Sequence, residues 1–213
     1  MSKNYNTAKP DHKVITQVIP SGSSVLDLGC GEGDLLYLLV REKNVKARGV
    51  DIDERAIYKC VEKGLSVFHG DIDSGLADYN DKSFDYVILN QSLQQVRSLE
   101  PAIKSALRVG NKVIVGIPNF AHYKARYRIF LKGRTPVTNA LPYQWYNTPN
   151  LHFLSIADFI DYCHAKEIKI EYSYFIGDKH RINMLPNLFA QIGIFVISRP
   201  MDSSLSAEQG GIE

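Results

Sequence analysis

The chain has 213 residues, of which 45% are hydrophobic, and its 25 Lys plus Arg against 23 Asp plus Glu give a formal net charge of +2. This length favours one domain and suffices for one buried core. A nearly balanced charge excludes a chain that is basic throughout, so we expect binding neither to nucleic acid nor to an anionic membrane.

The sequence contains no recognisable membrane-spanning segment, signal peptide or metal-binding motif. No segment approaches the ~18 consecutive apolar residues of a membrane-spanning helix, and the first twenty residues lack the apolar core of a signal peptide. The three cysteines are too widely spaced for a metal clip or a disulfide framework. We therefore expect a cytoplasmic protein without a metal site.

Short β-branched segments alternate with segments of helical spacing. The predicted strands are 24–28, 45–51, 65–69, 84–89, 112–117, 168–176 and 192–198. The helical patterns among the first five are Leu35–Leu39, Ala56–Val61 and Ile103–Leu107. Because strand–helix alternation produces a parallel sheet covered on both faces, we predict an α/β fold with a doubly wound, mostly parallel seven-stranded sheet.

The chain divides into three predicted parts. Residues 1–20 form an N-terminal segment, residues 21–200 form the domain with an insertion at about 122–151, and residues 201–213 form a disordered tail. The insertion is predicted to contain a helix from His122 to Lys132 and then a long loop, Thr135 to Leu151, of the kind found in lids and interfaces. Ser155 is predicted to cap the next helix, with Asp158 three residues later.

The most informative motif is a glycine-rich loop between the first strand and the first helical pattern. Gly29, Gly31 and Gly33 allow the backbone to turn sharply and lie against a ligand, and the helix start offers unpaired N–H groups. Asp51 ends the second strand twenty residues after Gly31, where a doubly wound sheet presents a carboxylate to ribose hydroxyls. This pattern predicts a nucleotide-type ligand.

Three acidic residues end neighbouring predicted strands: Asp27, Asp51 and Asp71. We expect them to face one crevice. Asp27 would repel the pyrophosphate of a dinucleotide, whereas S-adenosylmethionine carries a sulfonium and an ammonium that a carboxylate attracts. The charge pattern therefore favours S-adenosylmethionine.

Residues 22–118 resemble the class I S-adenosylmethionine-dependent methyltransferases, which have a Rossmann-like fold. The resemblance implies that the loop from Gly29 to Gly33 lines the methionine end of the ligand, that Asp51 holds the ribose and that Gly70 and Asp71 meet the adenine. With S-adenosylmethionine or S-adenosylhomocysteine as the ligand, the predicted binding residues are Asp27, Gly29, Cys30, Gly31, Gly33, Asp51, Ile52, Asp71, Ile72 and Asn90.

A narrower resemblance covers nearly the whole chain up to about Arg199. Segments 89–96 (LNQSLQQV), 116–122 (GIPNFAH) and 134–153 (RTPVTNALPYQWYNTPNLHF) resemble the MetW family of bacterial methionine biosynthesis proteins. This resemblance implies association with a homoserine O-acyltransferase of the α/β-hydrolase kind. The chain has no G-x-S-x-G elbow, so it is not itself that acyltransferase.

The segment from Ala125 to Tyr146 is predicted to dock the acyltransferase or to cover the cofactor crevice. Its helix carries five positive charges between Lys124 and Arg134 and one apolar stripe, and it is followed by the chain's single tryptophan, Trp145. The stripe consists of Tyr123, Tyr127, Phe130 and Leu131.

The sequence is compatible both with catalysis by the chain itself and with a non-catalytic role. Methyl transfer from a sulfonium depends mainly on orientation and requires no fixed triad, so Asn90, Asn119 and His122 are candidate catalytic residues from their places after the fourth and fifth strands. One alternative is a free-standing methyltransferase acting on a small molecule. The other is a non-catalytic scaffold with an empty crevice, against which the glycines and strand-end acids argue.

Overall fold

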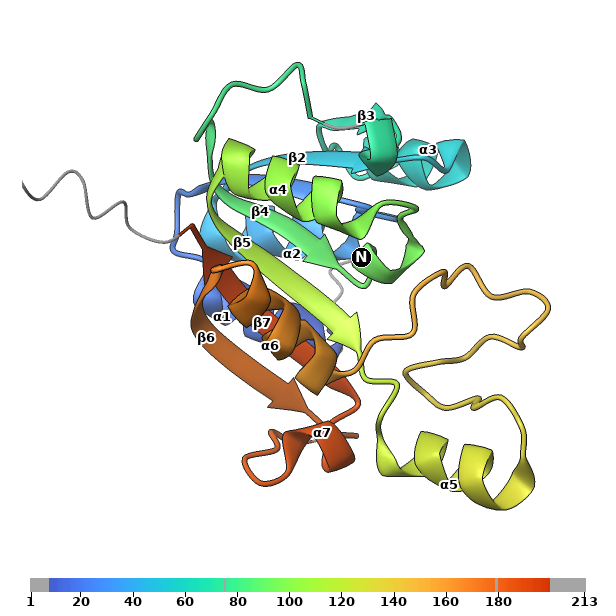
Figure 1. Cartoon of the computed structure of the whole chain (residues 1–213). Coiled ribbons are helices and arrows are strands. Elements are labelled where there is room, and N and C mark those ends of the chain that lie inside the picture. The colour runs from blue at the N-terminus through green and yellow to red at the C-terminus, as the bar shows by residue number, and fades with distance from the viewer. Residues whose placement is uncertain (1–7, 75, 179, 200–213) are drawn as a thin grey trace, which may run out of the picture.

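The computed structural model describes residues 8–74, 76–178 and 180–199, so the tail predicted at 201–213 lies outside the described residues. Within these residues the chain forms a seven-stranded sheet in the order β3-β2-β1-β4-β5-β7-β6 (Figure 1). The strands are β1 (Ser24–Leu28), β2 (Lys46–Asp51), β3 (Val67–His69), β4 (Phe84–Asn90), β5 (Gly110–Pro118), β6 (Lys169–Ile176) and β7 (Ile192–Ser198).

The sheet is mostly parallel, as predicted. Strands β1 to β5 pair in parallel, whereas β7 lies between β5 and β6 and is antiparallel to both. The strand order reverses between β1 and β4, and ligands of doubly wound sheets bind at the carboxyl ends of the strands beside such a point. This places the expected crevice at the ends of β1 and β4.

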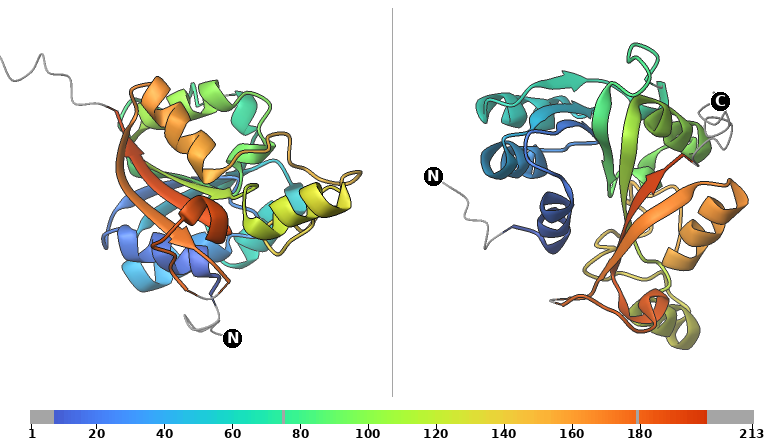
Figure 2. Two further views of the ribbon diagram at one scale, coloured as in Figure 1. Left: turned by 60° about the horizontal axis from the view of Figure 1, so that its bottom comes forward. Right: turned by 90° about the vertical axis from the view of Figure 1, so that its left-hand side faces the viewer.

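Helices cover both faces of the sheet. They are α1 (Pro10–Val18), α2 (Asp34–Lys43), α3 (Glu54–Glu62), α4 (Leu99–Val109), α5 (Tyr123–Lys132), α6 (Ile156–Ala165) and α7 (Pro186–Phe189). Figure 2 shows α4 and α6 on one face and α1 and α2 on the other.

Two hydrophobic clusters follow from this layering. Successive side chains of a strand point to opposite faces, so Val87 and Val113 pack in the cluster of α4 and α6 while Ile88 and Ile114 pack in that of α1 and α2. Helix α1 belongs to the second cluster through Ile15, which is fully buried. The described part of the predicted N-terminal segment, which contains α1, thus supplies a wall of the domain.

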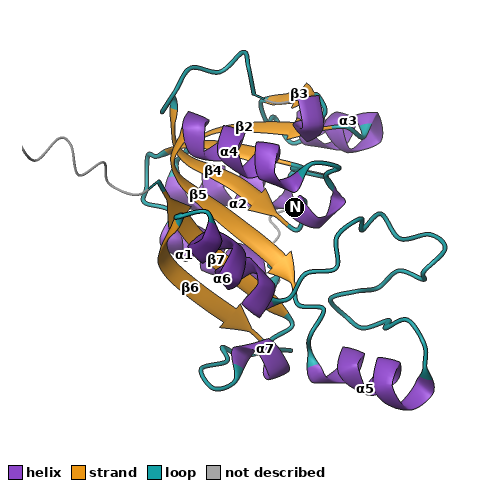
Figure 3. Ribbon diagram, in the orientation of Figure 1, coloured by secondary structure: helices purple, strands orange, loops and turns teal. Residues whose placement is uncertain are grey.

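The insertion lies beyond the carboxyl end of β5 (Figure 1). Helix α5 begins at Tyr123 with His122 as its N-cap, and no helix or strand is described between residues 133 and 155, which Figure 3 shows as one long loop. The loop ends at a capping box, in which Ser155 Oγ accepts a bond from Asp158 N (3.2 Å) and Asp158 Oδ2 accepts one from Ser155 N (2.8 Å). The predicted helix, long loop and cap are all confirmed.

In the described part of the chain no helix is both long and apolar enough to cross a membrane.

Candidate functional site

The glycine loop has the conformation that the sequence predicts. The φ angles of Gly29, Gly31 and Gly33 are +79°, +53° and +73°, in the region where a side chain causes strain. A Cβ on Gly29 would also lie 2.6 Å from the Cβ of Ser92. The loop therefore needs glycine at these positions in order to turn and to approach the segment after β4.

Asp51 fixes this loop from the end of β2. Its Oδ2 accepts a hydrogen bond from Gly31 N at 2.6 Å, and its Oδ1 accepts one from Asp53 N at 2.9 Å. A carboxylate has about four acceptor positions, so these two bonds leave capacity for ligand hydroxyls. Asp51 thus both shapes the loop and remains able to hold a ribose.

A cavity of about 460 Å³ lies where the loop, the end of β4 and the start of α1 meet, and this volume is within the range of small-molecule sites. Five of the ten predicted binding residues line it: Asp27, Gly29, Cys30, Gly31 and Asn90. The rest of its lining is Lys9, Asp11, His12, Glu32, Asp34, Leu35 and Gln91. We call this cavity the crevice.

Asp27 gives the crevice its chemistry. The side chain is buried, and burial followed by the nearby carboxylate of Asp51 raises the pKa of Asp27 from 3.8 to about 7. A buried carboxylate is costly unless it is paired, so a cation in the crevice fits this group and a diphosphate does not. The ammonium of an S-adenosyl ligand meets that requirement, and S-adenosylmethionine adds a sulfonium.

The other predicted binding residues lie outside the crevice. Ile52 is exposed, and Gly33 is buried beneath the loop against Cys60. Asp71 Oδ1 accepts a bond from Asp73 N at 2.9 Å, and Ile72 packs against the main core. Like Asp51, these residues lie at the ends of β2 and β3 or in the glycine loop, along the same edge of the sheet as the crevice. A ligand longer than the crevice would extend along this edge.

Helix α1 supplies crevice residues that the sequence analysis missed. Asp11 is 1% exposed, and its Oδ2 accepts bonds from Asn90 Nδ2 (2.9 Å) and Gln91 Nε2 (2.8 Å). His12 lies beside it, and burial lowers the pKa of its imidazole. No local motif marks these residues, because their role arises from where α1 packs on the sheet.

Two of the three catalytic candidates have structural roles away from the crevice lining. Asn119 Nδ2 donates to the carbonyls of Ala190 (2.8 Å) and Asn187 (3.1 Å), and its Oδ1 accepts from Ala121 N (3.0 Å).

His122 caps α5, since its Nδ1 accepts from Lys124 N at 3.3 Å, and burial lowers the pKa of its imidazole. Asn90 does line the crevice, with its Oδ1 buried and unpartnered, but an amide is not a base. Among the described residues no group of His, Cys, Asp and Glu side chains is arranged to hold a metal ion.

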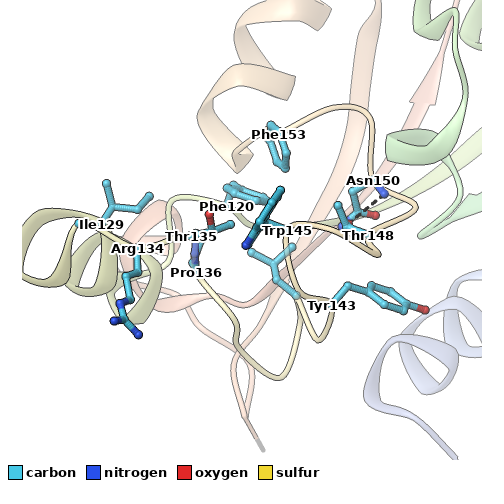
Figure 4. Close-up of a pocket in the computed structure, with 12 residues that line it drawn as sticks. Phe120, Ile129, Arg134, Thr135, Pro136, Tyr143, Trp145, Thr148, Asn150 and Phe153 are labelled. Carbon is cyan, nitrogen blue, oxygen red and sulfur yellow. Dashed lines mark hydrogen bonds between the residues drawn. The ribbon is translucent and has the colours of Figure 1, made fainter.

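A second cavity, of about 470 Å³, lies between α5 and the long loop. Figure 4 shows the side chains of Phe120, Trp145 and Phe153 near one another among the residues that line it, and the ring centroids of Phe120 and Phe153 are 4.6 Å apart in edge contact. Its lining also includes Ile129, Pro136, Leu141, Arg134, Thr148 and Asn150. We call it the insertion cavity.

The apolar stripe predicted on α5 points into solvent. Phe130 is 87% exposed and Tyr127 54%, while Trp145 in the following loop is 72% exposed. Exposed apolar side chains of this size are typical of interaction surfaces. We call the exposed aromatic and apolar side chains of the insertion the insertion surface, which consists of Tyr123, Tyr127, Phe130, Leu131, Tyr143, Trp145 and Tyr146.

Comparison with known proteins identifies the family. The sequence profile described as "Methionine biosynthesis protein MetW" matches residues 9–197. The chain belongs to the MetW family. A relative from Rhodopirellula baltica, "Bifunctional methionine biosynthesis protein MetXA/MetW", is 33% identical over 207 residues, covering 91% of this chain and 33% of the relative. The MetW-family chain thus spans about a third of that protein's length.

Solved structures show the fold. A SAM-dependent methyltransferase of Thermotoga maritima, described as a possible histamine N-methyltransferase, has a TM-score of 0.64 at 18% identity, covering 89% of this chain and 87% of that one. An S-adenosylmethionine dependent methyltransferase of Mesorhizobium loti has a TM-score of 0.64 at 16% identity, covering 89% and 96%. The MetW-family chain therefore has the Rossmann-like methyltransferase fold that its sequence predicts.

Proposed function

We propose that this chain binds S-adenosylmethionine or S-adenosylhomocysteine in the crevice and serves as an accessory subunit of a homoserine O-acyltransferase. The observation that carries the accessory role is the Rhodopirellula relative, in which a region similar to this chain is joined to further sequence in a protein named for both MetXA and MetW. The observation that supports the ligand is the buried carboxyl group of Asp27, which lines the crevice.

The proposed ligand is held by groups of complementary chemistry. Asp27 faces its cationic end, and the turn from Gly29 to Gly33 lines the same end. The N–H groups of Gly29, Cys30, Gly31 and Gly33 already donate to Val50, Asp51 and Cys30, so they are not assigned to the carboxylate of the ligand. The free acceptor positions of Asp51 take the ribose hydroxyls. Asp71 and Ile72 then lie toward the adenine. When bound, S-adenosylmethionine supplies an activated methyl group.

The accessory role is favoured over a free-standing methyltransferase by the exposed aromatic side chains of the insertion, while two of the catalytic candidates have structural roles. The amide of Asn119 is occupied by three hydrogen bonds and His122 serves as a helix cap. The exposed stripe of α5 supports a partner instead. Large aromatic side chains such as Trp145 dominate interface energetics, and the prolines of the loop limit the entropy lost on docking.

Titration calorimetry tests the ligand. Wild-type protein is expected to bind S-adenosylmethionine and S-adenosylhomocysteine, and Asp51→Ala removes a charge-assisted hydrogen bond worth ~1.5–3 kcal/mol, or roughly tenfold to hundredfold in affinity. Asp53→Ala is the matched control, because Asp53 caps α3 outside the crevice. Equal affinities for wild type and Asp51→Ala would contradict the ribose assignment, and tighter binding of NAD would contradict the ligand.

Co-purification with the homoserine O-acyltransferase of the same organism tests the partner. Replacing Trp145 and Tyr146 by Ala is expected to cost ~2 kcal/mol or more of complex stability if they are interface hot spots. Tyr58 and Phe68 are also exposed aromatic residues but lie on α3 and β3, so their replacement by Ala is the control. Undiminished co-purification of the Trp145 and Tyr146 variant would remove the proposed docking surface.

A further inference from the structure

The segment that follows β4 connects the crevice to the insertion. It begins at Gln91, which has a left-handed backbone conformation with φ of +57°. Gln91 N donates to the carbonyl of Gly116 on β5 (2.7 Å), and Gln91 Nε2 donates to Asp11 on α1 (2.8 Å). Since Gln91 lines the crevice and a non-glycine residue is strained in this conformation, it is positioned to respond to what the crevice holds.

Gln94 is hydrogen-bonded to Gln91. It belongs to the short 3-10 helix Leu93–Gln95, is 4% exposed, and its Nε2 donates to the carbonyl of Gln91 at 2.7 Å. Its Oε1 is buried without a partner. The amide is therefore only half satisfied, and a rearrangement that brings a donor to its Oε1 would stabilise it.

The backbone carbonyl of Gln94 contacts the end of the insertion loop. The carbonyl of Gln94 accepts bonds from Leu151 N (2.8 Å) and His152 N (3.1 Å), and His152 Nε2 donates to the carbonyl of Val96 (2.9 Å). The neighbouring residues Asn150 and Phe153 line the insertion cavity together with Trp145. A shift of the 3-10 helix therefore moves a wall of the insertion cavity.

We propose that a ligand in the crevice sets the shape of the insertion surface through Gln91 and Gln94, with Gln94 as the positioning residue between the two sites. The proposal rests on the proposed function, because it takes the S-adenosyl ligand in the crevice and the acyltransferase on the insertion surface. It makes partner docking depend on the ligand, and by thermodynamic linkage the partner changes ligand affinity by the same factor.

Trp145 reports on this coupling without any label, because it is the single tryptophan of the chain. Its fluorescence is recorded while wild-type protein is titrated with S-adenosylmethionine or S-adenosylhomocysteine, and calorimetry measures binding in the same samples. Trp145 does not line the crevice, so a fluorescence change that saturates with calorimetric binding is the expected result. A ligand that binds with no change at Trp145 overturns the coupling and leaves the proposed ligand intact.

Two variants with a matched control locate the connection. Gln94→Met preserves side-chain length but removes the bond to Gln91, and it is expected to bind ligand while losing the fluorescence response. Gln95→Met is the control, because Gln95 is exposed and bonds the same carbonyl at 3.1 Å, and it is expected to respond like wild type. His152→Phe cuts the bond to Val96 and keeps the test decisive where Gln94→Met fails to fold.

The outcomes separate the coupling from the proposed function. A wild-type response in Gln94→Met or in His152→Phe overturns the connection through the 3-10 helix. Absence of calorimetric binding to wild type overturns the proposed ligand and the coupling together. In complex with the acyltransferase, the factor by which the ligand changes partner affinity is expected to fall to one in Gln94→Met and to persist in Gln95→Met. A merely structural role of Gln94 would leave that factor unchanged.

Discussion

At the scale of single residues, the protonation state of the Asp27 carboxyl group is linked to the binding of a cationic ligand in the crevice. The folded protein holds a proton on Asp27 between its ordinary pKa of 3.8 and the raised pKa of about 7, a window in which the unfolded chain has lost it. Raising the pH through this window therefore removes stability, because the carboxyl group ionises in the unfolded chain and stays protonated in the folded protein. A cationic ligand stabilises the ionised form of Asp27 in the folded protein.

This linkage predicts a pH-dependent affinity for S-adenosylmethionine. Affinity is expected to rise ~tenfold from one pH unit below the Asp27 pKa to one unit above it and then to level off, because the cation binds the ionised carboxylate. Calorimetric titrations across that range measure the effect. Asp27→Asn has nearly the same shape and no charge, so it is expected to bind more weakly and with little pH dependence near 7. An unchanged pH profile in that variant would assign the titration to another group.

At the scale of the elements, two helix N-caps of the same residue type differ in what their side chains do. Ser155 Oγ bonds Asp158 N at the start of α6, whereas Ser98, the N-cap of α4, makes no side-chain capping bond. Ser155→Ala is expected to lower the free energy of unfolding by ~1 kcal/mol, because a backbone N–H of the first turn loses its partner.

Urea denaturation measures this difference. Ser98→Ala is the control and is expected to unfold at nearly the wild-type midpoint, because no side-chain capping bond is lost. An equal loss in the two variants would show that the capping box does not contribute measurably to α6.

The strands and most of the helices were predictable because their periodicity is local, whereas α1 and α7 were not predicted. β1 and β7 match the predicted ranges 24–28 and 192–198, and the predicted helix 122–132 differs from α5 by its N-cap, His122. The three strand-end acids were predictable for the same reason, since Asp27 and Asp51 lie within predicted strands and Asp71 lies two residues after one.

The rest of the crevice depends on tertiary packing. Asp11 reaches Asn90 across 79 residues of sequence, and nothing local to either residue signals that contact. Sequence also cannot distinguish a histidine that caps a helix from one that acts as a base, and the structure places His122 as a cap. The same holds for Gln94, whose two-sided contacts exist only after the loop has folded onto the segment following β4.

At the scale of the whole molecule, the balanced net charge conceals a strong asymmetry. Residues 101–157 contain eight Lys and Arg and no Asp or Glu, so the remaining chain carries 17 basic against 23 acidic residues. Five of the eight lie between Lys124 and Arg134, beside the exposed stripe of α5. A partner face that is apolar with acidic residues complements this surface.

This asymmetry predicts that the complex with the acyltransferase weakens as salt is added. Lys132 and Arg134 are exposed near the end of α5, so Lys132→Glu with Arg134→Glu is expected to lower affinity about tenfold or more, mainly through a slower association rate. Lys46→Glu with Arg48→Glu makes the same charge change on β2, far along the sheet from the insertion, and is expected to leave affinity close to wild type. Association rates at several salt concentrations measure this difference. Equal effects of the two double variants would mean that the net charge of the chain, and not the surface of α5, attracts the partner.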